Sequence, residues 1–189
     1  MSMTLLIVIG VVVLLLLVAV AIYNRLVRLR ALVREAFSGI TVQLRRRADL
    51  IPNLVETVKG YATHEKATFE AVTAARAVPT GSGVAATAAA DATMTSLIGR
   101  LFAVAEAYPE LRASENFQQL QAEISSIETE LQSARRYYNA TVRDLNTAVQ
   151  TFPNVLIAGP MGFREEEPYA DPDASIQSAP KVSFDRPAA

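Results

Sequence analysis

The chain contains one histidine, and its neighbours decide whether it could take part in metal or acid–base chemistry. His64 is followed by Glu65, and a helical zinc protease motif would need a second histidine four residues after the first, on the same helix face. That position is Thr68. The chain also has no cysteine to supply a thiolate ligand or nucleophile. We therefore interpret His64 as a surface residue of a helix, and we expect neither a metal nor a cofactor.

Two other kinds of catalytic motif do not fit the sequence. Gly81-Ser82-Gly83 has no lysine after it and no strand pattern before it, so it does not resemble a phosphate-binding loop. A serine hydrolase would have to use His64 as its base, and no flanking Gly-x-Ser-x-Gly turn is present to expose a serine. We therefore expect a protein that is not an enzyme.

Several polar residues at helical spacing remain as candidates for ligand binding. The basic run Arg45-Arg46-Arg47 lies about 30 Å of helix from the membrane end described below, which is several times the screening length of about 8 Å. A solvated helix face is the favoured interpretation, and an anion or partner site is the alternative. Helix surface or interhelical hydrogen bonding is also the interpretation for a second polar set: Asp49, Asn53, Glu56, Asn139 and Asn146.

The element that anchors these helices is an apolar run near the start of the chain. Leu5 to Tyr23 is dominated by Leu, Val and Ile, and about 19 helical residues match the roughly 30 Å hydrocarbon core of a bilayer. Ala19-Val20-Ala21 resembles the cleavage site of a signal peptide. However, the residues before Leu5 carry no Lys or Arg, so we expect a retained transmembrane helix over residues 5–23.

Basic residues next to this run predict its orientation. Four arginines follow it and none precede it, which places the bulk of the chain in the cytoplasm and residues 1–4 outside. We expect a single-pass protein of the bacterial inner membrane. Tyr23 falls where aromatic side chains meet lipid headgroups. The predicted membrane-interface site, with the lipid bilayer as its partner, consists of Tyr23, Arg25, Arg28 and Arg30.

The rest of the chain has the periodicity of an all-α protein. Apolar residues recur at steps of three and four, which predicts helices over residues 24–77, 84–107 and 115–152 in one antiparallel bundle, residues 24–153. Pro52 is expected to kink the first helix without ending it, because the apolar phase is the same on both sides. The third helix is the most regular, and Leu131 lies at its middle. The net charge of −1 gives no argument for a nucleic-acid partner.

The remaining tail, residues 154–189, is rich in proline and acidic residues and has no periodicity of its own. Glu165-Glu166-Glu167 follows an apolar patch. We expect the tail to lie on a folded neighbour, and the predicted tail contact consists of Val155, Leu156, Ile157, Met161 and Phe163.

Several segments resemble the LemA family of bacterial membrane proteins. They are residues 23–27, 42–56, 101–109 and 134–139, followed by Phe152-Pro153 and Gly162-Phe163, in the same order and over roughly Tyr23 to Phe163. The resemblance implies an amino-terminal anchor and a cytoplasmic helical bundle, and it brings no catalytic residues. The chain departs from the usual family pattern mainly between Val78 and Thr95.

The unequal lengths of the expected helices suggest a function. In an up-down-up arrangement the second helix covers only the distal half of the first, which leaves a membrane-proximal apolar stripe without a partner in the chain. The stripe, predicted as an oligomer contact, consists of Leu26, Val33, Phe37, Ile40 and Leu44. The leading hypothesis is a homo-oligomeric scaffold that organises or shapes the membrane. The alternative is an adaptor on the cytoplasmic face that binds another envelope protein, such as a membrane protease.

Overall fold

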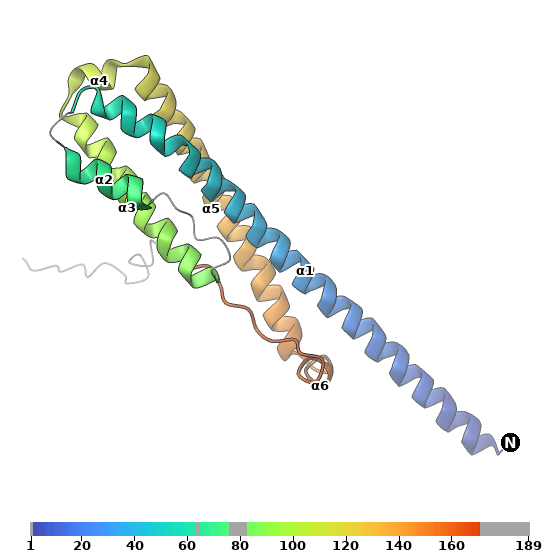
Figure 1. Cartoon of the computed structure of the whole chain (residues 1–189). Coiled ribbons are helices and arrows are strands. Elements are labelled where there is room, and N and C mark those ends of the chain that lie inside the picture. The colour runs from blue at the N-terminus through green and yellow to red at the C-terminus, as the bar shows by residue number, and fades with distance from the viewer. Residues whose placement is uncertain (1, 63–64, 76–82, 171–189) are drawn as a thin grey trace, which may run out of the picture.

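The computed structural model describes residues 2–62, 65–75 and 83–170, and these residues form an all-α fold, as expected. His64, Gly81 and Ser82 lie outside the described residues. The helices follow one another as α1 (Met3–Lys59), α2 (Lys66–Ala75), α3 (Val84–Glu106), α4 (Pro109–Ala113), α5 (Glu115–Gln150) and α6 (Val155–Ala158). Figure 1 shows an elongated bundle from which the amino-terminal part of α1 projects alone.

Helix α1 combines the apolar run with the first part of the bundle in one uninterrupted helix of 57 residues. It is the one helix of the described chain that is long and apolar enough to cross a membrane. Its most apolar window has a mean hydropathy of 3.6, and none of that window is buried by the rest of the chain. The helix continues through Pro52, as its unbroken apolar phase predicts.

The first helix ends earlier than the sequence pattern suggests, so the expectation of one helix over residues 24–77 is wrong. Helix α1 stops at Lys59, Gly60 and Tyr61 form a turn, and the chain resumes as the separate helix α2. The buried residues Phe69 and Val72 keep apolar spacing in α2. This spacing extends the pattern across the turn, although α2 packs against α3 rather than continuing along α1 (Figure 1).

Because α1 ends early, the part of it that lies in the bundle has the same length as α5. Residues 24–59 number 36, and α5 also has 36 residues, so α5 can cover the whole bundle part of α1. The two helices run side by side and make the most extensive contact in the fold (Figure 1). The premise that the membrane-proximal stripe lacks a partner in the chain is therefore wrong, because α5 rather than the second expected helix covers it.

The other two helical ranges are close to those expected. Helices α3 and α5 begin at the predicted residues and end within two residues of the predicted positions. The Ala-rich first half of α3 is helical, as the strong helix propensity of alanine favours. The short helices α4 and α6 were not anticipated, and each makes a turn at one end of α5.

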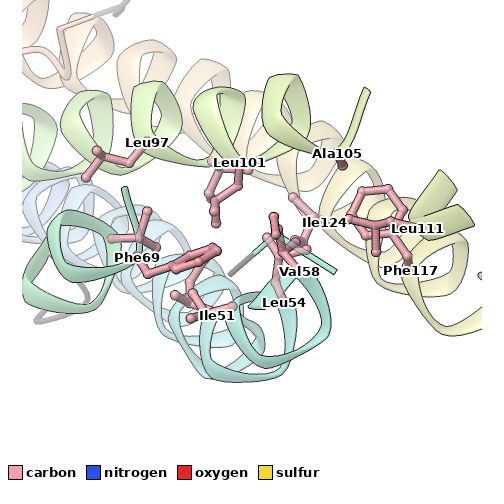
Figure 2. Close-up of a cluster of buried hydrophobic side chains, with 14 of the residues drawn as sticks. Ile51, Leu54, Val58, Phe69, Leu97, Leu101, Ala105, Leu111, Phe117 and Ile124 are labelled. Atoms are coloured by element: carbon pink, nitrogen blue, oxygen red, sulfur yellow. The ribbon is translucent and has the colours of Figure 1, made fainter. Parts of the chain in front are cut away.

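Apolar packing continues along the full length of the bundle. The distal core, farthest from the apolar run, joins α1, α2, α3, α4 and α5 around Leu54, Val58, Phe69, Leu101 and Phe117 (Figure 2). A central core joins α1 to α5 around Ile40, Leu131 and Val142. A third cluster lies where α1 enters the bundle. Together they hold the helices against one another as a rod.

Candidate functional site

A cluster of charged side chains lies inside the bundle, between the distal and central cores. Arg47 projects from α1, Asp91 from α3, and Glu128 and Arg135 from α5. Only 1% of Arg47 is exposed to solvent, and Asp91 and Arg135 are buried as well. A buried charge is costly unless it is paired, so the arrangement of these four groups decides whether the bundle can form.

Asp91 is the centre of this cluster. Its Oδ1 accepts a hydrogen bond from Arg47 Nη2 at 2.6 Å, and its Oδ2 accepts one from Arg135 Nη2, also at 2.6 Å. The carboxylate of Glu128 accepts from Arg47 Nη1 at 3.0 Å and from Arg135 Nη1 at 3.4 Å. Two positive and two negative charges therefore balance inside the bundle.

A residue from beyond α6 completes the cluster. The Tyr169 hydroxyl donates a hydrogen bond to Asp91 Oδ2 at 2.8 Å, and the tyrosine is buried. Burial raises the pKa of Tyr169, the charge of Asp91 and this hydrogen bond raise it further, and the two arginines lower it in part. Burial alone lowers the pKa of Arg135, but Asp91 and Glu128 more than reverse this effect. Tyr169 therefore remains a proton donor and Arg135 remains charged.

The segment that delivers Tyr169, residues 164–170, is an extended strap along α5. Asn146 donates from Nδ2 to the carbonyl of Glu166 and accepts from its amide at Oδ1, both at 2.9 Å. Asn139 makes the same pair with Tyr169, at 3.1 and 2.8 Å. Seven helical residues rise about 10.5 Å and three extended residues span about 10 Å, so this spacing holds the strap antiparallel to α5 in one register.

Tyr138 fixes the strap between these two asparagines. Its hydroxyl donates to the carbonyl of Glu167 at 2.9 Å, and its ring packs against Tyr169 and Phe37. The pKa of Tyr138 is raised to about 12, mainly by burial and further by the nearby Glu166 and Glu167 carboxylates. The strap is thus held by hydrogen bonds to its backbone, and two buried tyrosines lie at its inner face.

At the other end of the strap the chain closes onto α1. Gly162 has a φ of 74°, which allows the turn in which the Phe163 amide donates to the carbonyl of Ala158 at 2.9 Å. Phe163 is buried against the Tyr23 ring, with centroids 5.7 Å apart, and the Arg30 guanidinium lies 4.4 Å from the centroid of its ring. An open cleft of about 380 Å³ lies nearby, lined by Arg25, Leu29, Asp144, Thr147, Ala148, Thr151 and Asn154.

Comparison with known proteins identifies this architecture. The model of the LemA family matches residues 36–184, which include most of the bundle, the ion cluster and the strap. The chain belongs to the LemA family.

The relatives of this chain include proteins named MamQ as well as one named LemA. The magnetosome protein MamQ of Magnetospirillum gryphiswaldense is 24% identical over 77% of this chain and 63% of its own length. The magnetosome protein MamQ 2 of Paramagnetospirillum magneticum is 25% identical over 80% of this chain and 66% of its own. The protein LemA of Metamycoplasma hominis is 28% identical over 68% and 60%. The chain thus spans less than two thirds of the length of these relatives.

The structure places two of the four predicted interface residues against Phe163. Tyr23 and Arg30 contact the Phe163 ring, whereas Arg25 and Arg28 are exposed on α1. In the predicted oligomer stripe, Leu26, Val33, Ile40 and Leu44 are buried and Phe37 is half-buried. Their burial within one chain removes the argument for a contact between copies, which stays an untested prediction.

The predicted tail contact divides into two parts. Phe163 is buried and Ile157 half-buried against the α1–α5 pair, so these residues lie on the chain's own bundle. Val155, Leu156 and Met161 are exposed. The polar residues Asn139 and Asn146, interpreted as helix surface or interhelical hydrogen bonding, instead bind the backbone of the strap.

Sequence reasoning missed the ion cluster, and the solvated-face interpretation is wrong for Arg47. Arg45 and Arg46 are exposed, as it requires. Arg47, however, follows Ile40 by seven residues and precedes Leu54 by seven, so it occupies a buried position of the heptad. Arg135 likewise follows Leu131 by one turn, on the buried side of α5. The signal in the sequence is that two charged residues, Arg47 and Arg135, stand at positions where the helical repeat otherwise places apolar residues.

Proposed function

We propose that this protein is a non-enzymatic, membrane-anchored scaffold whose copies assemble with one another to organise or shape the membrane. The observation that carries the proposal is the continuity of α1, which is both the candidate membrane span and a core helix of the bundle. Because the helix has no break between these parts, the bundle is held at a defined angle to its anchor. A protein that only needed tethering would be served by a flexible linker.

The interior of the bundle also suits a structural role. A buried cluster of charges adds little net stability, because loss of hydration offsets the attraction between the charges. Its effect is on specificity, since Arg47, Asp91 and Arg135 pair in only one register of α1, α3 and α5. Such a cluster favours one rigid arrangement over many similar ones.

The chemistry available in the described part of the chain gives no competing argument for catalysis. Among residues 2–62, 65–75 and 83–170, no group of three or more His, Cys, Asp or Glu side chains could hold a metal ion. Arg47, Asp91 and Arg135 are buried, and the half-buried Glu128 is paired with both arginines, so the charged groups of the ion cluster already hold one another as partners. The names of the MamQ relatives refer to magnetosomes, which fits a structural role better than a metabolic one.

Contacts between copies need a surface other than the buried stripe. Val42 on α1 is 58% exposed and Tyr137 on α5 is 53% exposed, both on the bundle and away from the candidate span. A contact between copies that removed these two side chains from water would be stabilised by their burial. We assign the self-contact to the outer faces of α1 and α5 that carry these two residues.

Mass measurement in mild detergent tests the scaffold. The purified full chain should form assemblies of many copies, visible by electron microscopy, and Val42→Asp combined with Tyr137→Asp should reduce the mass while leaving the helix content unchanged. Arg45→Asp combined with Arg136→Asp is the matched control, since both arginines are exposed on the same two helices. A parent chain that measures as a monomer at all concentrations would remove the scaffold hypothesis.

One observation favours the adaptor as a second candidate. The carboxylates of Glu165, Glu166 and Glu167 are exposed, although the backbone that carries them is fixed to α5. A fixed acidic surface could bind a basic surface of another envelope protein, such as a membrane protease. A monomeric parent chain that binds one defined envelope protein, with loss of binding when the three glutamates become glutamines, would support this function instead.

The proposed scaffold lies on the cytoplasmic side of the bacterial inner membrane. The support is the four arginines that follow the apolar run, at positions 25, 28, 30 and 34. A protease added outside intact cells should leave residues 24–153 uncut, and should cut them once the membrane is opened. Cleavage of the bundle in intact cells would reverse the orientation.

A further inference from the structure

The turn between α5 and the strap carries large apolar side chains that no other described residue covers. Phe152 is 75% exposed and Leu156 is 66% exposed, and Val155 and Met161 are exposed as well. No charged residue occurs between Asp144 and Arg164. We refer to residues 152–161 as the α6 corner. It is both uncharged and apolar on the outside, which is unfavourable for a surface in water.

The inner side of this corner is fixed to the place where α1 leaves the bundle. Ala158 and the adjoining Phe163 are buried in one cluster with Ile22 and Leu26 of α1. Figure 1 shows α6 beside α1 at the end of the bundle, where the projecting part of α1 begins. The exposed side of the α6 corner therefore lies at the same level as Tyr23, the residue expected at headgroup depth.

We infer that the α6 corner inserts its exposed apolar side chains into the headgroup region of the same bilayer that α1 spans. The occupant of this surface is lipid because the inner side of the corner packs on Ile22 and Leu26, directly after the exposed apolar residues 5–20 of α1. Charge supports the same assignment. Arg25 and Arg28 are exposed on α1 and Arg164 follows the corner, so phosphate groups beside the inserted residues would meet positive charge.

This second membrane contact is distinct from the span and independent of self-assembly. The span passes through both leaflets, whereas the corner is too short to pass beyond the outer part of one of them. Each copy would add volume to the cytoplasmic leaflet and not to the opposite one, at a fixed position beside α1. The inference therefore gives the proposed scaffold a means of bending a membrane without depending on contacts between copies.

The absence of native cysteine makes the test direct. In the full chain, Leu156→Cys is labelled with a polarity-sensitive fluorophore and reconstituted into vesicles of phosphatidylcholine and phosphatidylglycerol, with or without lipids that carry a quencher near the headgroup. The control is Tyr61→Cys, because Tyr61 is an exposed residue in the turn after α1, at the end of the bundle farthest from the span and outside the proposed self-contact. Both substitutions replace exposed side chains, so both variants should keep the parent helix content.

We expect the label at position 156 to emit at shorter wavelength than the label at position 61 and to be quenched several-fold more by the quencher lipids. Equal emission and equal quenching at the two positions would overturn the inference. So would a label at position 156 that is shielded from water but not quenched by lipid, since a protein would then cover the corner. Val155→Cys serves as a second probe of the same corner. Mass measurement in detergent reports on the scaffold separately.

Discussion

Arg47 of α1 and Asp91 of α3 form a buried ion pair, with Nη2 and Oδ1 2.6 Å apart, although the two residues are 44 positions apart in the chain. The pair joins α1, which carries the candidate membrane span, to α3. Asp91 also pairs with Arg135 of α5. One carboxylate therefore holds three helices together.

Replacing this carboxylate should be severely destabilising. Asp91→Ala leaves the guanidinium groups of Arg47 and Arg135 close together with only Glu128 to balance them, which should cost about 3 to 5 kcal/mol of unfolding free energy. Denaturant unfolding of the full chain in detergent would measure it. Asp49→Ala, which removes an exposed carboxylate of α1, should change stability by less than about 0.5 kcal/mol. Similar losses for the two variants would contradict the central role of Asp91.

The strap should come loose when its two asparagine contacts are removed. Asn139→Ala combined with Asn146→Ala deletes four hydrogen bonds to the strap backbone, each worth about 0.5 to 1.5 kcal/mol. Hydrogen exchange at the Glu166 and Tyr169 amides should accelerate at least about tenfold, while α5 amides keep their protection. Asn116→Ala, an exposed position on the same helix, is the control. Unchanged exchange at both amides would mean that the tyrosines alone hold the strap.

Packing along α5 should depend strongly on the helix face. Leu131 is completely buried in the central core, so Leu131→Ala should cost about 2 to 5 kcal/mol. Gln132, its neighbour, is exposed, and Gln132→Ala should have little effect. Thermal unfolding of the two variants checks the difference, and equal shifts would be incompatible with the observed facing of α5.

Strong alkali should release the strap before it unfolds the helices. The pKa of Tyr138 is raised from 10.0 to about 12, and that of Tyr169 is raised as well. A group with a raised pKa contributes stability that is fully present below its unfolded pKa and is lost as the pH rises through its folded pKa. The stabilisation should therefore be intact below about pH 10 and lost mainly between pH 10 and 12.

Tyrosine ionisation and amide exchange of the strap, followed together across this range, would check the alkaline release. The Tyr138→Phe variant has no hydroxyl to ionise at this position, so amide exchange of its strap should depend less on pH between pH 10 and 12 than in the parent chain. If the strap separates from α5 below pH 9 in the parent chain, these tyrosines do not control it.

The bounds of a helix could be predicted where its apolar residues recur at helical spacing from one end to the other. Helix α5 has an uninterrupted apolar stripe around Leu131, and its bounds were predicted almost to the residue. Helix α1 was extended too far, because the stripe resumes in α2 at Phe69 and Val72 after a short turn at Gly60. Periodicity records which face of each helix is buried and does not show that the chain has changed direction.

The site was harder to predict because its members belong to different helices. Pairing among Arg47, Asp91 and Arg135 depends on how three helices are aligned, and a single sequence does not contain that alignment. The spacing of the asparagines at positions 139 and 146 predicts helix surface or interhelical hydrogen bonding, but their partners are backbone groups of the strap, which have no side-chain signature. The positions of Arg47 and Arg135 in the apolar phase of their helices could have indicated burial, but not which groups they pair with.

Because α1 is one unbroken helix, a change in the tilt of its candidate membrane span would move the whole bundle with it. From Tyr23 to Lys59 the helix extends about 54 Å beyond the apolar run, so a change of about 20° in its tilt would move the distal tip by about 18 Å. Tilt of a membrane span responds to the thickness of the hydrocarbon layer. Small differences in bilayer thickness would therefore be converted into large displacements of the end of the bundle that carries α2, α3 and α4.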